Sequence, residues 1–178
     1  MIRRLLIANR GEIALRIIRA CRELGITSIA IYSDADTDSM HVKMADEAVA
    51  IGGLSGADSY LDLKKVMDAA KKSYAQAIHP GYGYLSESPE FPEACRKAHI
   101  IFIGPTGDVI ARMGNKSVAR KLMVDAGVPV IPGTLKDLRN VRVAARAADQ
   151  LGYPVIVKAT SGGGGKGMRI VRDRAELD

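Results

Sequence analysis

A glycine-rich turn near the end of the sequence carries its strongest sign of chemistry. Five glycines fall within residues 162–167, between a segment that ends at Lys158 and another that begins at Met168. Glycine lets a backbone approach a phosphate closely, and successive N–H groups can form a concave anion site. A P-loop needs its Lys and a Ser or Thr at the start of a helix, so this turn between strands instead indicates a flap over phosphates. The alternative is a flexible hairpin with solvated lysines.

Two further stretches contain candidate ligand contacts. Lys116 follows Asn115 at a predicted helix start, where the helix dipole disfavours a cation unless an anion binds, although a solvated lysine is equally compatible. The stretch HPGYGYLSES follows a predicted strand, and ligands gather at the carboxyl ends of strands in open α/β sheets. Tyr82, between two glycines, could present an exposed ring. For His79 we favour a structural role, hydrogen-bonded in a tight turn.

The first turn, NRGE over residues 9–12, argues against a dinucleotide site. It has one glycine where the dinucleotide fingerprint needs three, so the suitable spacing of Asp34 for a ribose contact carries little weight. No nucleophile–base pair is evident, and no paired carboxylates that could hold Mg²⁺ follow the glycine loop. The residues alone therefore predict a phosphate-binding α/β protein.

Alternating strands and helices must position these residues. Apolar runs predict strands over residues 5–8, 26–32, 47–51, 75–79, 100–103, 155–159 and 168–171. Helical periodicity predicts helices over residues 12–24, 63–74, 89–98, 107–113, 115–126 and 141–151, with a further helix beginning near residue 174. Tyr74 is expected on the apolar stripe of its helix. The βαβ alternation predicts a mostly parallel sheet with helices on both faces.

The same pattern suggests the domain organisation. From Gly104 onward the alternation of strands and helices gives way to two helices in succession, over residues 107–113 and 115–126. The connector VPVIPGT, bounded by prolines, marks the change.

Composition narrows the class of protein. The net charge of +6 suits an anionic ligand such as a nucleotide. We expect no nucleic-acid partner, because the basic residues are scattered and few aromatic residues could stack on bases. Cys21 and Cys95 are far apart, which argues against a disulfide framework or a zinc site, and Cys21 is expected to be buried. No apolar run approaches the roughly 20 residues that span a bilayer, so we expect a cytoplasmic protein without a membrane segment.

The motifs together resemble those of biotin carboxylases, which belong to the ATP-grasp ligases. The resembling segments run through the chain in order: LLIANRGEIALRIIRACRELGI, IYSDAD, AIHPGYGYLSES, FIGP, MGNKSVAR, AGVPVIPG, GYPVIVKA and GGGGKGMR. NRGEIA and HPGYG are the most specific of them. The family occurs as a subunit or domain of acetyl-CoA, propionyl-CoA and pyruvate carboxylases. The resemblance implies a Rossmann-like (pre-ATP-grasp) parallel-sheet domain over residues 1–113, a helical linker over 114–133, and the truncated start of an ATP-grasp lid over 134–178.

The resemblance also implies a reaction. The family uses ATP, Mg²⁺ and bicarbonate to form carboxyphosphate, and then carboxylates biotin held on a biotin carboxyl carrier protein, which serves a carboxyltransferase. Lys116 and Lys158 match its nucleotide-contacting lysines, and Met168 matches a residue of its adenine pocket. Tyr82 and Gly83 match positions near the biotin ring. The loop that closes over the phosphates corresponds to Gly162, Gly163, Gly164, Gly165, Lys166 and Gly167.

Other features of the resemblance concern assembly and completeness. Arg16, Arg19 and Glu23 match dimer-contact positions of the bacterial form, although an exposed helix face explains them equally well. Asn115 departs from the Asp that is more usual there. Family members continue for several hundred residues, so the metal ligands, the bicarbonate site and the catalytic base are expected beyond Asp178, and this chain alone is expected to be inactive. The alternatives are another ATP-grasp ligase, of carbamoyl-phosphate or purine-pathway type, and a non-catalytic folding or dimerisation module.

Overall fold

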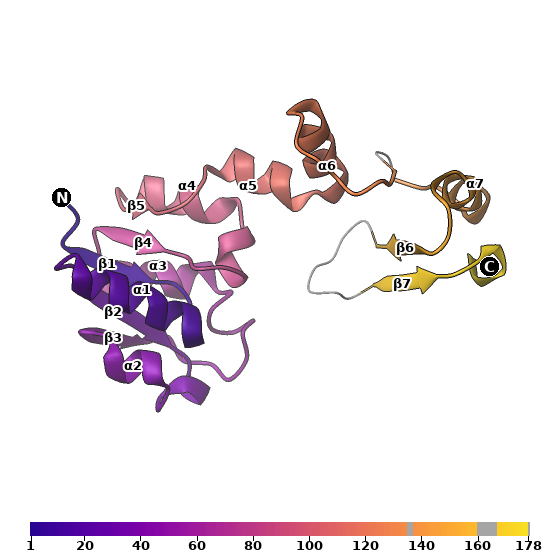
Figure 1. Ribbon diagram of the computed structural model, residues 1–178. Helices are drawn as coiled ribbons and strands as arrows, with labels where there is room; N and C mark the ends of the chain where they lie inside the picture. The colour runs from indigo at the N-terminus through magenta and orange to yellow at the C-terminus, as the bar shows by residue number, and fades with distance from the viewer. Residues whose placement is uncertain (135–136, 160–166, 178) are drawn as a thin grey trace. The chain divides into compact units, whose positions relative to one another are not determined.

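The computed structural model describes residues 1–134, 137–159 and 167–177 (Figure 1). The chain divides into two compact units, Met1–Ala111 and Arg112–Asp178, and each is described by itself.

The first unit is built on a parallel sheet of five strands. They are β1 (Arg4–Ile7), β2 (Thr27–Tyr32), β3 (Glu47–Ala50), β4 (Ala77–His79) and β5 (Ile101–Phe102), in the order β3-β2-β1-β4-β5. Every neighbouring pair is parallel, so all carboxyl ends meet at one edge. The predicted Rossmann-like α/β fold is confirmed.

Helices cover both faces of this sheet, as the alternating pattern predicts. On one face, α1 (Gly11–Glu23) packs its apolar stripe on the sheet and contacts α2 (Met40–Met44). Its core contains Leu5, Ile7, Ala14, Ile17, Ile18, Cys21 and Ala77. On the other face lie α3 (Leu63–Lys72) and α4 (Glu90–Lys97), with a core that includes Leu6, Ile29, Ile31, Val66, Met67, Ile78, Phe91 and Cys95. The expected burial of Cys21 is confirmed, at 2% exposure.

One prediction about the core is wrong. Tyr74 is 81% exposed and lies outside α3, which ends at Lys72. The Ser73 hydroxyl donates to the Ala69 carbonyl at 2.8 Å, and Tyr74 takes a φ of +54°, so the chain leaves the helix before Tyr74 can join its buried stripe. Ala75 then donates its N–H to the Ala70 carbonyl at 2.9 Å, which closes the end of the helix.

The second unit combines short helices with a hairpin. It contains the end of α5 (Gly107–Gly114), which spans the boundary, then α6 (Lys116–Asp125) and α7 (Val141–Leu151). Strands β6 (Val155–Lys158) and β7 (Met168–Val171) pair antiparallel, and a 3₁₀ turn over Arg174–Leu177 follows. Asn115 and Asn140 cap α6 and α7, where their side-chain oxygens accept backbone N–H bonds at 3.0 and 2.9 Å. In the described parts of both units, no helix has the length and apolar character needed to cross a bilayer.

Candidate functional site

The β6–β7 hairpin brings together two of the residues predicted to bind nucleotide. Lys158 lies directly opposite Met168, and Ile156 lies opposite Ile170. Directly paired residues project to the same face of a sheet, and so do residues two apart along a strand. One face of the hairpin therefore carries three apolar side chains, each more than half exposed, beside one ammonium group. An apolar surface beside a cation suits a purine ring attached to phosphates.

A second lysine reaches the same end of the hairpin. Lys116 is the first residue of α6, as predicted, and its Nζ donates to the Ala159 carbonyl at 3.3 Å. Ala159 directly follows Lys158 in the chain, so both predicted lysines lie where β6 enters the glycine loop. A cation at a helix start conflicts with the helix dipole, and a bound anion would relieve that conflict.

Gly167, at the described end of the glycine loop, has a backbone geometry that favours glycine. Gly167 has a φ of +71°, and its carbonyl accepts the Ala159 N–H at 2.9 Å. A Cβ at Gly167 would lie 3.0 Å from the Ala159 Cβ, which is tighter than nine in ten real Cβ contacts. Gly162, Gly163, Gly164, Gly165 and Lys166 lie outside the described residues.

The HPGYG stretch forms a tight turn after β4, at the carboxyl edge of the first unit's sheet. His79 Nδ1 accepts the Gly81 N–H at 3.0 Å, and burial lowers the pKa of His79, which favours the neutral ring that can accept. The hydrogen bond expected for His79 in this tight turn is present. Gly81 and Gly83 both take positive φ values, +66° and +64°.

Tyr82 presents its ring between these glycines. Its side chain is 58% exposed, and its phenol donates a hydrogen bond to the Glu12 carboxylate in the first turn of α1. This hydrogen bond raises the pKa of the Tyr82 phenol above its ordinary value. The structure thus gives Tyr82 the exposed, stackable ring that the sequence suggested.

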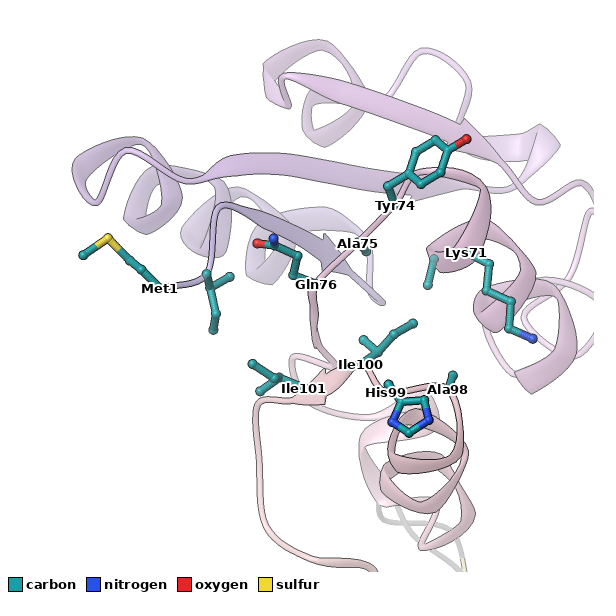
Figure 2. Close-up of a pocket in the computed structure, with 11 residues that line it drawn as sticks. Met1, Lys71, Tyr74, Ala75, Gln76, Ala98, His99, Ile100 and Ile101 are labelled. Atoms are coloured by element: carbon teal, nitrogen blue, oxygen red, sulfur yellow. The ribbon is translucent and has the colours of Figure 1, made fainter.

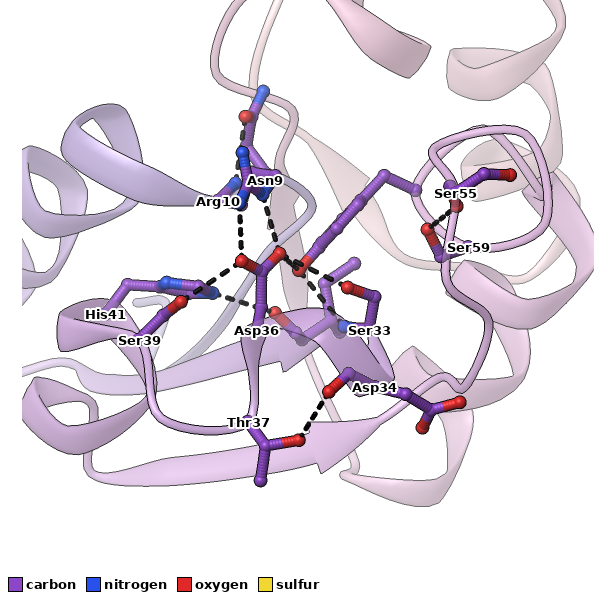
Figure 3. A network of polar contacts seen from close by, with 12 residues as sticks. Asn9, Arg10, Ser33, Asp34, Asp36, Thr37, Ser39, His41, Ser55 and Ser59 are labelled. Carbon is purple, nitrogen blue, oxygen red and sulfur yellow. Dashed lines mark hydrogen bonds and ion pairs between the residues drawn. The ribbon is translucent and has the colours of Figure 1, made fainter.

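A buried carboxylate organises the neighbouring loops, and sequence reasoning missed it. Asp36, after β2, accepts from Arg10 Nε at 2.6 Å and from a second nitrogen of the same guanidinium (Figure 3). It also accepts from the Tyr60 phenol at 2.7 Å, and Ser33 and Ser39 donate through their hydroxyls. Pairing with Arg10 holds the pKa of Asp36 well below its usual range, while burial and Asp36 raise the pKa of Tyr60 to about 12. The only signal in the sequence was the polar run SDAD after a predicted strand.

Asp34, in the same run, does not join this network. Its carboxylate accepts the Gly53 N–H at 3.0 Å and so orders the loop after β3. The weak interpretation of Asp34 as a ribose contact gains no support from this hydrogen bond.

The predicted dimer-contact residues lie on the outer side of α1. Arg16, Arg19 and Glu23 are exposed, whereas the opposite stripe of the helix is buried in the sheet. Arg16 also borders a mainly apolar cavity of about 340 Å³ that Ile13, Ile17 and Ile103 help to line.

A further pocket lies away from these residues. A pocket of about 830 Å³ opens beside the amino ends of β1, β4 and β5, where Met1, Gln76 and Ile101 line it together with Lys71 and His99 (Figure 2). None of the residues predicted to bind a ligand reaches it, and ligands of parallel α/β sheets favour the opposite edge. Within residues 1–134, 137–159 and 167–177, no three His, Cys, Asp or Glu side chains come close enough together to hold a metal ion.

Comparisons with known proteins identify the family of this chain. Residues 1–110 match the family model "Biotin carboxylase, N-terminal domain", and residues 115–178 match "Carbamoyl-phosphate synthase L chain, ATP binding domain". Biotin carboxylase 1 of Bacillus subtilis is 54% identical over 177 residues, which are 99% of this chain and 39% of that protein. The biotin carboxylase of Halalkalibacterium halodurans is 53% identical over 99% of this chain and 39% of its own length. This chain thus spans less than half of the length of these relatives.

Solved structures show the same fold. A biotin carboxylase–β,γ-ATP complex from Campylobacter jejuni superposes with a TM-score of 0.91 at 46% identity, over 99% of this chain and 40% of that chain. A second structure is the biotin carboxylase domain dimer of the Hydrogenobacter thermophilus 2-oxoglutarate carboxylase, in complex with MgADP, ADP and bicarbonate. It superposes with a TM-score of 0.89 at 48% identity, over 99% of this chain and 39% of that chain. The amino-terminal family model covers more than half of this sequence, and the chain belongs to the biotin carboxylase family.

Proposed function

We propose that this chain is the amino-terminal part of an ATP-dependent ligase that carboxylates biotin with bicarbonate by way of carboxyphosphate. The observation that carries the proposal is the hairpin face, where Lys158 lies opposite Met168 and Lys116 reaches the Ala159 carbonyl. A relative of the same fold was solved as a complex with an ATP analogue, which supports a nucleotide at this face.

Each residue of this face has a distinct task. Met168, with Ile156 and Ile170, provides an apolar surface for the adenine ring. Lys116 and Lys158 place positive charge near the phosphates, where charge redistributes during phosphoryl transfer. Gly167 directly precedes β7, the return strand after the loop that we expect to cover the phosphates. Mg²⁺ would neutralise phosphate charge when bound, and we assign no residue of this chain as its ligand.

The second half of the reaction concerns biotin. We propose that Tyr82 and Gly83 lie near the ring of biotin, which is supplied on a biotin carboxyl carrier protein and passed on to a carboxyltransferase. The exposed Tyr82 ring at the carboxyl edge of the sheet supports this assignment. We further propose that Arg16, Arg19 and Glu23 contribute to a homodimer, since one relative is described as a dimer. Both cysteine thiols are free and buried, which suits a reducing compartment such as the cytoplasm.

A second candidate is an ATP-grasp ligase of the carbamoyl-phosphate type. The match of residues 115–178 to an ATP-binding domain of that class favours it. Both enzymes would use the hairpin face for ATP, so the acceptor distinguishes them. Only a biotin carboxylase requires biotin as the acceptor.

The test is a hybrid enzyme in which residues 1–177 replace the matching segment of Bacillus subtilis biotin carboxylase 1, which is 54% identical. We expect the folded hybrid to release ADP in the presence of bicarbonate at a rate that rises with free biotin. Circular dichroism and gel filtration establish that the hybrid is folded. A folded hybrid that hydrolyses ATP without any response to biotin would overturn the proposal.

A further inference from the structure

The NRGE turn, residues Asn9 to Glu12, lacks the glycines of a nucleotide-binding turn but occupies the place of one. It follows β1, at the carboxyl edge of the sheet, and opens α1. Its polar side chains instead contact other loops of the same unit: Asn9 and Glu12 contact the turn after β4, and Arg10 contacts the segment after β2. The turn that binds pyrophosphate in dinucleotide-binding folds is thus engaged here in hydrogen bonds within the protein.

Asn9 is buried, and both polar atoms of its side-chain amide form hydrogen bonds. It is 2% exposed, and its Nδ2 donates to the Pro80 carbonyl at 2.8 Å and to the Tyr82 carbonyl at 2.7 Å. Its Oδ1 accepts the Arg10 N–H at 2.9 Å. Two carbonyls on one side and one N–H on the other fix the orientation of the amide, because only its nitrogen can donate. Asn9 thus holds the backbone on both sides of Gly81.

The turn after β4 fits tightly against this amide. Gly81 has a φ of +66°, and a Cβ there would lie 2.8 Å from Asn9 Nδ2. The backbone therefore approaches Asn9 as closely as only glycine allows. Strand pairing continues up to this point, since Ala8 donates its N–H to the His79 carbonyl at 2.9 Å.

The same NRGE turn also holds the far end of Tyr82. The phenol of Tyr82 contacts the Glu12 carboxylate, three residues after the amide that binds its backbone carbonyl. An exposed tyrosine ordinarily samples several rotamers, and an attachment at both ends removes that freedom. The ring is thus fixed while more than half of its side-chain surface stays open to solvent.

We propose that the NRGE turn is a clamp that fixes the Tyr82 ring for contact with biotin, with Asn9 and Glu12 as its positioning residues. The assignment of the ligand rests on the proposed function, whereas the clamp itself rests on the contacts above. Neither Asn9 nor Glu12 needs to touch the ligand. Their contribution is a preorganised ring and turn, which lowers the entropy lost when a ligand binds.

The clamp can be tested in the 178-residue chain by titrating the Tyr82 phenol by NMR with ring-labelled tyrosine. The signal of Tyr82 is the one that disappears in Tyr82→Phe. We expect Glu12→Gln to lower the pKa of Tyr82 toward its ordinary value, because the negative acceptor is removed. We expect Asn9→Ser, which is smaller, adds no charge and can donate only one hydrogen bond, to lower this pKa as well, because the released turn no longer holds the phenol against Glu12.

The matched control is Asn140→Ser. The Asn140 side-chain oxygen only accepts a hydrogen bond, from the Val143 N–H, and a serine oxygen can accept the same bond, so this substitution should leave the Tyr82 titration unchanged. A folded Asn9→Ser chain in which Tyr82 titrates as in the unsubstituted chain would overturn the clamp. Asn9→Ala, which donates no side-chain hydrogen bond and adds no charge, answers the same question if Asn9→Ser does not fold.

The role toward biotin is tested in the hybrid enzyme described above. We expect Glu12→Gln and Asn9→Ser to raise the KM for free biotin roughly tenfold, because a displaced ring loses its alignment with the ligand. The KM for ATP should change less than about twofold, since uniform damage to the enzyme would affect both substrates. An unsubstituted hybrid without biotin-dependent turnover defeats the proposed function. If the hybrid depends on biotin but its KM for biotin is unchanged by both substitutions, the clamp is refuted and the proposed function stands.

Discussion

The guanidinium of Arg10 donates two hydrogen bonds to the carboxylate of Asp36, and this pair joins the turn after β1 to the segment after β2. The Asp36 side chain is 5% exposed, whereas that of Arg10 is 44% exposed. The carboxylate therefore depends on its protein partners, because little water reaches it.

We predict that Asp36→Ala lowers the free energy of unfolding by about 3 kcal/mol, because Arg10 and the buried Tyr60 hydroxyl lose their shared acceptor. Denaturation by urea measures this change. The control is Asp38→Ala, in which the removed carboxylate is 98% exposed and lies 3.6 Å from Lys43 Nζ. The control should change stability by less than about 0.5 kcal/mol. Equal losses in both variants would contradict the importance of the buried pair.

The same carboxylate predicts a pH dependence. Pairing with Arg10 lowers the pKa of folded Asp36, so its contribution to stability is complete above the unfolded-state pKa of about 3.9. The contribution is lost as the pH falls from that value toward the lower pKa of the folded state. The stability difference between the unsubstituted chain and Asp36→Asn should therefore shrink between about pH 6 and about pH 3. A difference that stays constant or grows on acidification would count against the ion pair.

The close approach of Gly81 to Asn9 predicts an energetic coupling. Gly81→Ala should destabilise the chain by about 2 kcal/mol, since it adds a clash with Asn9 Nδ2 to the strain of a positive φ. In the Asn9→Ala background the contacts with Nδ2 and Cγ are gone and only the 3.1 Å contact with the Cβ of residue 9 remains, so the added loss should be smaller by at least about 1 kcal/mol. Gly25→Ala is the control, because Gly25 shares a φ of +65° but has no atom within 4 Å of an added Cβ. Gly25→Ala should lower the free energy of unfolding by the same amount in both backgrounds. If Gly81→Ala also has the same effect with and without the Asn9 side chain, the contact is refuted.

Both thiols should be protected in the folded chain. Cys95 is fully buried and Cys21 is 2% exposed, and burial raises the pKa of both, that of Cys95 to about 12. We expect neither to react with a thiol reagent at about pH 8 until the chain unfolds, because the thiolate is the reactive form. Concentrated guanidinium should make both react rapidly. Rapid labelling of either thiol in the native chain would show that its helix opens readily.

The sheet and its helices could be predicted because each element shows its own periodicity. The stripe that includes Ile17 and Cys21 faces the sheet wherever the rest of the chain lies, and the pairing of Lys158 with Met168 follows from two strands around one loop. The end of α3 was harder to predict, because Tyr74 fits the helical spacing. Only the local hydrogen bonds of Ser73 and Ala75 show that the helix ends before Tyr74.

The polar contacts at the carboxyl edge could not be derived in this way. Asp36 meets Arg10 and Tyr60, which lie 26 and 24 residues away in the sequence, and no local pattern says which loops meet. The five-residue helix α2 is too short to show a periodicity. The missing glycines of the NRGE turn were visible in the sequence, but its contacts with the turn after β4 required the structure.

The most direct test of the nucleotide face is the KM for ATP of the hybrid enzyme carrying Lys158→Ala, compared with Arg169→Ala. Arg169 follows Met168 in β7 and lies opposite Val157, so it projects from the other face of the same hairpin. The account predicts a KM for ATP raised roughly tenfold or more by Lys158→Ala, since a charge-assisted phosphate contact is lost, and less than about twofold by Arg169→Ala. Equal effects of the two substitutions, or none from Lys158→Ala, would contradict a nucleotide site on this face.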